Sequence, residues 1–96
     1  VFVFPSLFEG LPLTLIEAQA NGLSVFASGT VSAECNVSET VRFLPLEKGA
    51  SFWADEIKKA MPFERKSSIE IIRSAGYDSA KSAEFLENFY LEKWCL

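Results

Sequence analysis

Two glutamates near the start of the chain have a spacing that suits a ligand rich in hydroxyl groups. Glu9 and Glu17 are separated by seven residues. Each carboxylate accepts two hydroxyl hydrogen bonds, and bonds to an ionised acceptor are the stronger kind. The alternative interpretation is that Glu9 is a solvated loop acid and Glu17 an exposed helix acid.

The residues around these acids predict a strand, a loop and the start of a helix. Val1–Phe4 is a β-branched and aromatic run that ends at Pro5, which has no N–H to donate to a sheet. Gly10 permits backbone angles closed to other residues, and Pro12 suits the first position of a helix. Because the first N–H groups of a helix lack partners, this helix start favours an anion such as phosphate.

The rise of the helix between Pro12 and Glu17 can be compared with the length of a ligand. From Pro12 to Glu17 a helix climbs about 7–8 Å, at ~1.5 Å per residue. This is the scale of a nucleoside diphosphate. One carboxylate would then lie near a sugar and the other near the ribose.

The stretch F-P-S-L-F-E-G-L-P-L-T-L-I-E-A-Q-A-N-G-L-S-V-F-A-S, residues 4–28, resembles glycosyltransferase family 4. These are the retaining nucleotide-sugar transferases of the GT-B fold. Their glutamate–seven residues–glutamate motif stands in an F-P-S-x-x-E-G-x-P context and is followed by a helix and an A-x-G-x-P-V strand. The later Ala75-Gly76-Tyr77-Asp78 and the closing aromatic helix resemble the tail of capsular and exopolysaccharide members.

The resemblance implies a site for a nucleotide-diphosphate sugar donor. Glu9 would be the catalytic residue that contacts the donor sugar, and Glu17 would bind the ribose hydroxyls. The backbone of Gly10 to Thr14 would face the diphosphate and the sugar. The implied donor-binding residues are Glu9, Gly10, Leu11, Pro12, Leu13, Thr14 and Glu17. The resemblance implies neither a metal nor a cofactor for this segment.

Composition limits the class of protein. The 96 residues make one domain at most, and 49% apolar residues with nine Phe and two Trp suffice for a core. A net charge of −4 argues against nucleic acid as a partner. The apolar run Val1–Phe8 is interrupted by Pro5 and Ser6 and falls short of the ~20 residues that span a bilayer. We expect a cytoplasmic protein, with a parent that can associate with the cytoplasmic face of the membrane.

The chain has two cysteines, Cys35 and Cys95, and no histidine. The absence of histidine removes the commonest general base and the Ser-His-Asp and Cys-His routes, and a zinc site is unsupported. A disulfide between the cysteines stays open as an alternative to reduced thiols, which are the usual state in the cytosol.

Periodicity and capping residues predict the remaining elements. The first helix would cover 12–21, with Gly22 as its cap and with Leu13, Leu15, Ile16 and Ala20 on its packing face. Two strands follow at 24–28 and 41–44, separated by a loop at 29–39 in which 30–34 can approach a ligand. Three further helices are predicted at 51–60, 65–75 and 79–94.

Particular residues begin, end or bury these later helices. Ser51 and Asp78 are the predicted N-caps of the second and fourth helices, and Gly76 is the predicted end of the third. Trp53 is predicted in the core. The third helix would turn Ile69, Ile72 and Ala75 inward. The closing helix carries an apolar stripe that we expect in the core, or exposed if a neighbouring domain is absent: Ala83, Leu86, Phe89, Tyr90 and Trp94.

The order of elements predicts an α/β fold, a partial doubly wound (Rossmann-like) domain of about three parallel strands plus C-terminal helices. The resemblance implies that 1–96 is the C-terminal half of a GT-B donor-binding domain. Because the chain opens without Met inside a strand that reads as buried on both faces, we also expect a fragment of a longer protein. The first three strands, the acceptor-binding domain and the family's basic Arg and Lys pair would precede Val1.

The expected function of the intact protein is transfer of a hexose or related sugar to a glycan acceptor in polysaccharide biosynthesis. The acceptor would bind through the missing N-terminal domain, and the fragment alone would be inactive. An isolated fragment is expected to dimerise through the exposed edge of Val1–Phe4. One alternative is a non-catalytic α/β domain that binds a nucleotide or a partner. Another is a GT-B epimerase or phosphorylase, although such relatives generally lack the F-P-S-x-x-E-G-x-P spacing.

Overall fold

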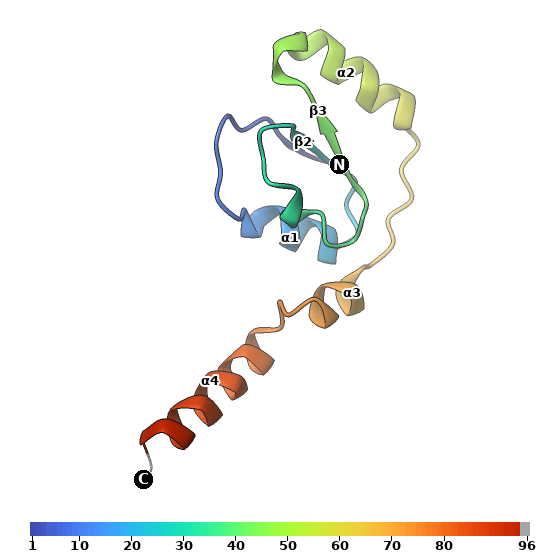
Figure 1. Ribbon diagram of the computed structural model, residues 1–96. Coiled ribbons are helices and arrows are strands. Elements are labelled where there is room, and N and C mark those ends of the chain that lie inside the picture. The colour runs from blue at the N-terminus through green and yellow to red at the C-terminus, as the bar shows by residue number, and fades with distance from the viewer. Residues whose placement is uncertain (95–96) are drawn as a thin grey trace.

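The computed structural model describes residues 1–94 (Figure 1). It alternates strands and helices along the first 60 residues and ends in helices. The elements in chain order are β1 (Phe2–Phe4), α1 (Leu13–Ala20), β2 (Val25–Ser28), the 3-10 turn η1 (Ala33–Cys35), β3 (Val41–Leu44), the 3-10 turn η2 (Leu46–Lys48), α2 (Gly49–Ala60), α3 (Ile69–Ser74) and α4 (Ser79–Trp94). The predicted α/β class, with three parallel strands and C-terminal helices, is confirmed.

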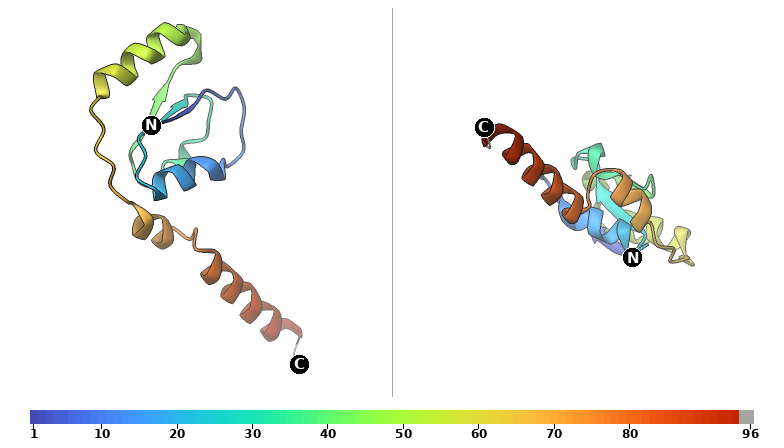
Figure 2. Two further views of the ribbon diagram at one scale, coloured as in Figure 1. Left: turned by 180° about the vertical axis from the view of Figure 1, so that it is seen from behind. Right: turned by 90° about the horizontal axis from the view of Figure 1, so that it is seen from below.

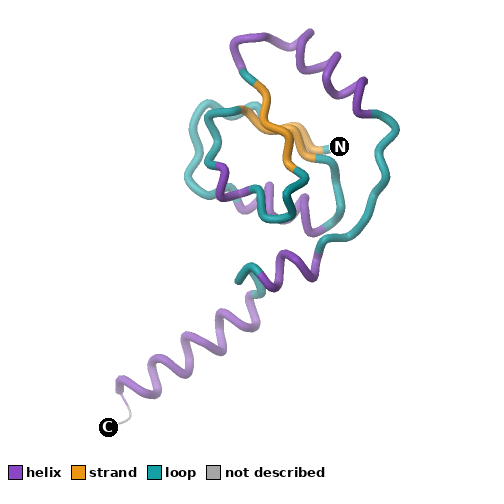
Figure 3. The backbone as a smooth tube through the Cα atoms, turned by 45° about the vertical axis from the view of Figure 1, so that its right-hand side comes forward, coloured by secondary structure: helices purple, strands orange, loops and turns teal. Residues whose placement is uncertain are grey.

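The three strands form one parallel sheet in the order β1-β2-β3, and Figure 3 shows them as orange segments of the backbone tube. Phe26 lies at the centre of the register, opposite Val3 on one side and Arg42 on the other. Parallel neighbours need a crossover, and α1 supplies it between β1 and β2. The carboxyl ends of all three strands therefore lie at the same edge of the sheet.

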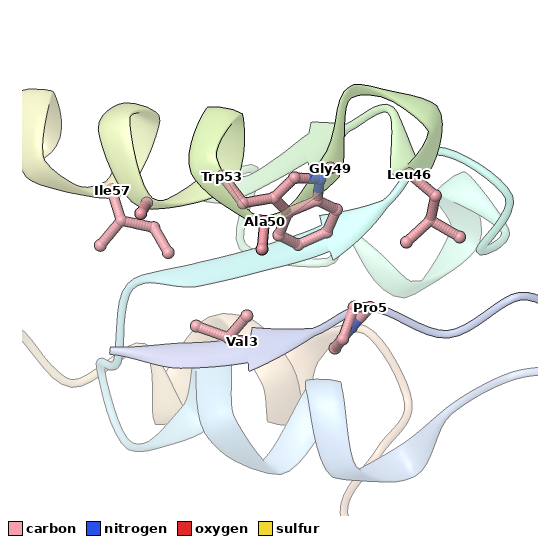
Figure 4. Close-up of a pocket in the computed structure, with 8 residues that line it drawn as sticks. Val3, Pro5, Leu46, Gly49, Ala50, Trp53 and Ile57 are labelled. Atoms are coloured by element: carbon pink, nitrogen blue, oxygen red, sulfur yellow. The ribbon is translucent and has the colours of Figure 1, made fainter.

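The two faces of the sheet are covered differently. On one face, Leu15 and Ala18 of α1 pack with Val25, Ala27 and Val41 into the main core. The opposite face carries α2, as the close-up in Figure 4 shows. Alternate strand residues point to opposite faces, so Phe26 lies on the face opposite the main core that contains Val25 and Ala27. Its ring packs edge-on against the ring of Phe63, with centroids 6.2 Å apart.

The carboxyl end of α1 is fixed by a distant segment. Gly22 has a φ of 76° and ends the helix as predicted. The side chain of Arg65 then donates from Nε to the Asn21 carbonyl at 2.9 Å, and the backbone N–H of Ser68 donates to the Ala20 carbonyl at 3.3 Å. Ser67 Oγ donates to the same Ala20 carbonyl at 3.2 Å.

These contacts explain why the predicted start of the third helix was wrong. The sequence pattern places that start at Arg65, whereas α3 begins at Ile69. Residues 65–68 donate to the carbonyls of α1 and do not form a helical turn of their own. The predicted inward face is also only partly right, since Ile72 is buried while Ile69 and Ala75 are exposed.

The predicted start of α2 was wrong by two residues, and its predicted end is confirmed. The helix runs from Gly49 to Ala60 instead of starting after a cap at Ser51. Gly49, with a φ of 80° and a ψ of 175°, turns the chain between η2 and α2, and no side chain caps the start of this helix. Trp53 is buried, as expected.

The closing helix α4 extends away from the sheet, as Figures 1 and 2 both show. Asp78 Oδ1 accepts the backbone N–H of Ala80 at 3.0 Å, which confirms Asp78 as its cap. None of the described residues of α4 is buried, so the core interpretation of its apolar stripe was wrong for this chain. The molecule is consequently 61 Å long and only 14 Å across its shortest axis.

The first strand is less buried than its sequence predicts. Val1, which precedes β1, is 55% exposed, and Val3 is 44% exposed and lines an open groove between β1 and α2. Among the helices of residues 1–94, none has the length and apolar character that crossing a bilayer requires.

Candidate functional site

The side chains that could bind a ligand lie at the carboxyl edge of the sheet. The loop of residues 5–12 leaves β1 there, and residues 29–32 leave β2 beside it. Open parallel sheets bind their ligands at this edge, where loops and helix starts converge.

The two loops are joined at Ser6. The hydroxyl groups of Ser28 and Thr30 both donate to the Ser6 carbonyl, Thr30 at 2.9 Å. Ser28 is fully buried at the end of β2, so the junction rests on a rigid element. Sequence reasoning gave Ser6 and Ser28 no role and named Thr30 only as part of a loop that can approach a ligand. The available signal was a pair of small hydroxyl residues directly after a strand.

Glu9 lies exposed in the loop after β1. Its Oε1 accepts a hydrogen bond from Ser6 Oγ at 3.0 Å. Gly10 beside it has open space where a side chain would be. The carboxylate is therefore oriented by a neighbour and still free to accept further hydroxyl groups.

The start of α1 is open to a ligand. Pro12 was predicted as the first residue of the helix, but it is the buried N-cap, and α1 begins one residue later, at Leu13. No side chain caps this end of the helix. The first turn of the helix holds no acidic residue. Its N–H groups and the positive end of the dipole would favour an anion at this position.

The exposed face of α1 carries Glu17 together with Leu13 and Thr14. Leu13 was predicted on the packing face, which was wrong, because it is 58% exposed. The face that packs on the sheet is made by Leu15, Ile16, Ala18 and Gln19. Residues three and four apart share one side of a helix, so Leu13, Thr14 and Glu17 are neighbours on the solvent side.

The charge around this edge is negative. The first 41 residues contain four glutamates and neither Lys nor Arg. Across residues 1–94, no cationic side chain is hydrogen-bonded to Glu9 or Glu17. The nearest cation in sequence, Arg42, lies over the ring of Phe26 at 5.5 Å from its centroid. A diphosphate at this site would need positive charge from elsewhere.

A buried glutamine holds the loop after β2 against α1, and sequence reasoning missed it. Gln19 Nε2 donates to the carbonyls of Leu15 at 3.0 Å and Cys35 at 2.6 Å. Its Oε1 accepts from the backbone N–H and the hydroxyl of Ser38, at 2.9 and 2.8 Å. All four hydrogen-bonding positions of this side chain are thus used.

Neither cysteine provides reactive chemistry in the described structure. Cys35, the last residue of η1, is fully buried, and burial raises the pKa of its thiol, with a backbone hydrogen bond opposing that shift. Cys95, and with it the possible disulfide, lies outside the described residues. Within residues 1–94 no three His, Cys, Asp or Glu side chains gather as a metal site would require.

An apolar groove lies on the opposite face of the sheet, between β1 and α2 (Figure 4). Its volume is 390 Å³, and Trp53, Ala50 and Ile57 of α2 line it opposite Val3 and Pro5. The indole N–H of Trp53 already donates to the Pro45 carbonyl at 2.9 Å. The groove offers no charged side chain to a sugar or a phosphate.

The chain is similar to a curated bacterial protein. It is 36% identical over 94 residues to "Putative glycosyltransferase EpsF" from Bacillus subtilis (strain 168), a match that covers 94% of this chain. The chain spans about a quarter of that relative's length, 24%. No family model and no solved structure matches the chain. Residues 1–96 are thus distantly homologous to one part of a protein described as a glycosyltransferase.

Proposed function

We propose that residues 1–96 are the C-terminal half of the donor-binding domain of a longer family 4 glycosyltransferase with the GT-B fold. The intact enzyme transfers a hexose or related sugar from a nucleotide-diphosphate donor to a glycan acceptor, with retention of configuration. The observation that carries the proposal is the arrangement of Glu9 and Glu17 on either side of the uncapped start of α1. The similarity to a glycosyltransferase supports it.

Each part of the edge has a role in this proposal. Glu9 accepts hydrogen bonds from hydroxyl groups of the donor sugar and so orients it. Glu17, about one turn after the start of α1, accepts hydrogen bonds from the ribose hydroxyls. The backbone of Gly10, Leu11 and Pro12, with Leu13 and Thr14 at the start of α1, faces the diphosphate and the sugar. The open N–H groups then stabilise the negative charge that develops on the departing diphosphate.

The charge of this chain indicates which half of the domain would supply the cations that bind the diphosphate. Neither Lys nor Arg occurs in the first 41 residues, and Lys48, which follows β3, lies over the Phe52 ring at 5.9 Å from its centroid, so the loop and helix that carry Glu9 and Glu17 bring no cation of their own to the diphosphate. We propose that the preceding half of the domain supplies those cations, and that residues 1–96 alone transfer no sugar. The apolar groove and the outer edge of β1 are the surfaces on which that half would pack. The acceptor would bind outside residues 1–96, and the parent would act at the cytoplasmic face of the membrane.

Ligand-observed NMR tests the donor site directly. The chain is titrated with UDP, GDP and ADP and with a sugar conjugate of each nucleotide. We expect saturation transfer to the ribose protons of one nucleotide, and loss of that signal in Glu17→Ala. Asp55→Ala, which removes an exposed acid from α2, is the matched control and should retain the signal. Equal signals in all three chains, or none in the unmodified chain, would refute the proposed site.

A further inference from the structure

Ser6 connects the glutamate of the proposed site to the end of a buried strand. Its hydroxyl donates to Glu9 Oε1 at 3.0 Å, and its carbonyl accepts the hydroxyls of Ser28 and Thr30. Ser28 and Thr30 stand 22 and 24 residues further along the chain. The orientation of Glu9 therefore depends on residues of a second loop, which no motif around Glu9 contains.

We propose that Ser6, Ser28 and Thr30 are positioning residues that hold the Glu9 carboxylate in the direction of the donor sugar. The inference rests on the proposed function, in which Glu9 contacts that sugar. The three residues do not touch the donor. They act through Glu9, and so they affect recognition of the sugar and leave recognition of the nucleotide unchanged.

The loop needs such a device because little else holds it. Leu7 and Phe8 are 79% and 87% exposed, and no strand or helix forms between Phe4 and Leu13. A carboxylate on a mobile loop must be ordered when the ligand binds, which reduces affinity. Hydrogen bonds to the buried Ser28 transfer the rigidity of β2 to the loop before the ligand arrives.

Thr30 is the member of the network best suited to a test. It is exposed, so removal of its hydroxyl leaves no buried polar group unpaired, whereas a change at the fully buried Ser28 risks the fold. Thr30→Val removes the hydroxyl at constant size, and Thr30→Ser retains it. Thr40→Val is the matched control, since Thr40 is an exposed threonine whose hydroxyl pairs with Ser38 and not with Ser6.

Two measurements on the whole chain test the inference. The first is the set of ¹⁵N order parameters of the backbone amides from residue 6 to residue 10 without ligand. We expect them to fall part of the way from about 0.85 towards 0.6 in Thr30→Val, in which the Ser28 bond to the Ser6 carbonyl remains, and to stay at the wild-type value in Thr30→Ser and Thr40→Val.

The second is the Kd for UDP-glucose and GDP-mannose beside the Kd for UDP and GDP. In Thr30→Val we expect a loss of about fivefold for the sugar conjugate of the nucleotide that binds, as for one hydrogen bond, and no change for the nucleotide alone. Equal losses for the two forms, or unchanged order parameters, would overturn the positioning role alone. Failure of the unmodified chain to bind any of these four ligands, or ADP and ADP-glucose, would overturn the proposed donor site and this inference with it.

Discussion

At the scale of single residues, Gln19 shows how one polar side chain can fix a loop. It is 1% exposed and makes hydrogen bonds to Leu15, Cys35 and Ser38. The segment that it holds includes η1 and leads into β3. Buried amides are tolerated only when their partners are present, and here every partner is supplied by backbone or hydroxyl groups.

Replacement of Gln19 by leucine should lower the free energy of unfolding by about 2–6 kcal/mol. The variant keeps the size of the side chain but leaves the Cys35 carbonyl and the Ser38 N–H unpaired, at about 1–3 kcal/mol for each buried group. Urea unfolding followed by the fluorescence of Trp53 would measure the change. Asn21→Ala removes an exposed side-chain bond from the same helix end and should change stability by less than about 0.5 kcal/mol. Equal stability of the two variants would contradict this role.

At the scale of elements, the junction between α1 and the segment before α3 is the tightest backbone approach among the glycines of the chain. A Cβ at Gly22 would overlap the backbone of Lys66, and the φ of Gly22 is 76°. Gly49 has nearly the same φ, 80°, but open space around it. The two glycines therefore separate the effect of backbone strain from the effect of close packing.

We expect Gly22→Ala to destabilise the chain more than Gly49→Ala does. Both variants place a side chain at a positive φ, which costs about 1–3 kcal/mol. Only the first must also displace residues 65–68 from the carbonyl end of α1. Thermal unfolding by circular dichroism gives the comparison, and backbone amide shifts of residues 65–68 report the displacement if Gly22→Ala still folds. An equal fall in Tm for both would show that this approach is not tight.

Local signals predicted the element ends that depend on nearby residues. Gly22, Gly76 and Asp78 were found because left-handed glycines and side-chain caps act within a few residues. The start of α3 was missed because the donors of residues 65–68 go to α1, more than 40 residues earlier in the chain. The candidate site divides in the same way. The Glu9–Glu17 spacing is readable in the sequence, whereas the Ser28–Ser6–Glu9 connection depends on the parallel pairing of β1 with β2.

At the scale of the whole molecule, the outer edge of β1 presents backbone hydrogen-bonding groups with which another strand can pair. The backbone N–H of Phe2 donates to Ser24 on the β2 side, so the N–H of Val3 points to the outer edge. Exposed edges of this kind recruit other chains. We propose that the isolated chain forms a symmetric dimer in which two β1 strands pair.

Size-exclusion chromatography with light scattering tests this dimer. The unmodified chain should elute at twice the monomer mass at micromolar concentration. Val3→Pro removes the outward N–H without a loss from the β1–β2 ladder and should give a monomer. Val3→Ala trims the same side chain but keeps the N–H, so it should remain a dimer. A monomeric unmodified chain would rule out the pairing.

The exposure of α4 has a consequence for the heat capacity of unfolding. That quantity rises with the apolar surface that becomes wet, at about 12–15 cal/mol/K per residue of an ordinary globular chain. None of the 16 residues of α4 is buried, although Leu86 and Phe89 are only 49% and 44% exposed, so the helix lowers an expected total of about 1.3 kcal/mol/K by at most about 0.2 kcal/mol/K. The stability curve is correspondingly flatter, and it would steepen in any longer protein in which a neighbouring domain covers the helix.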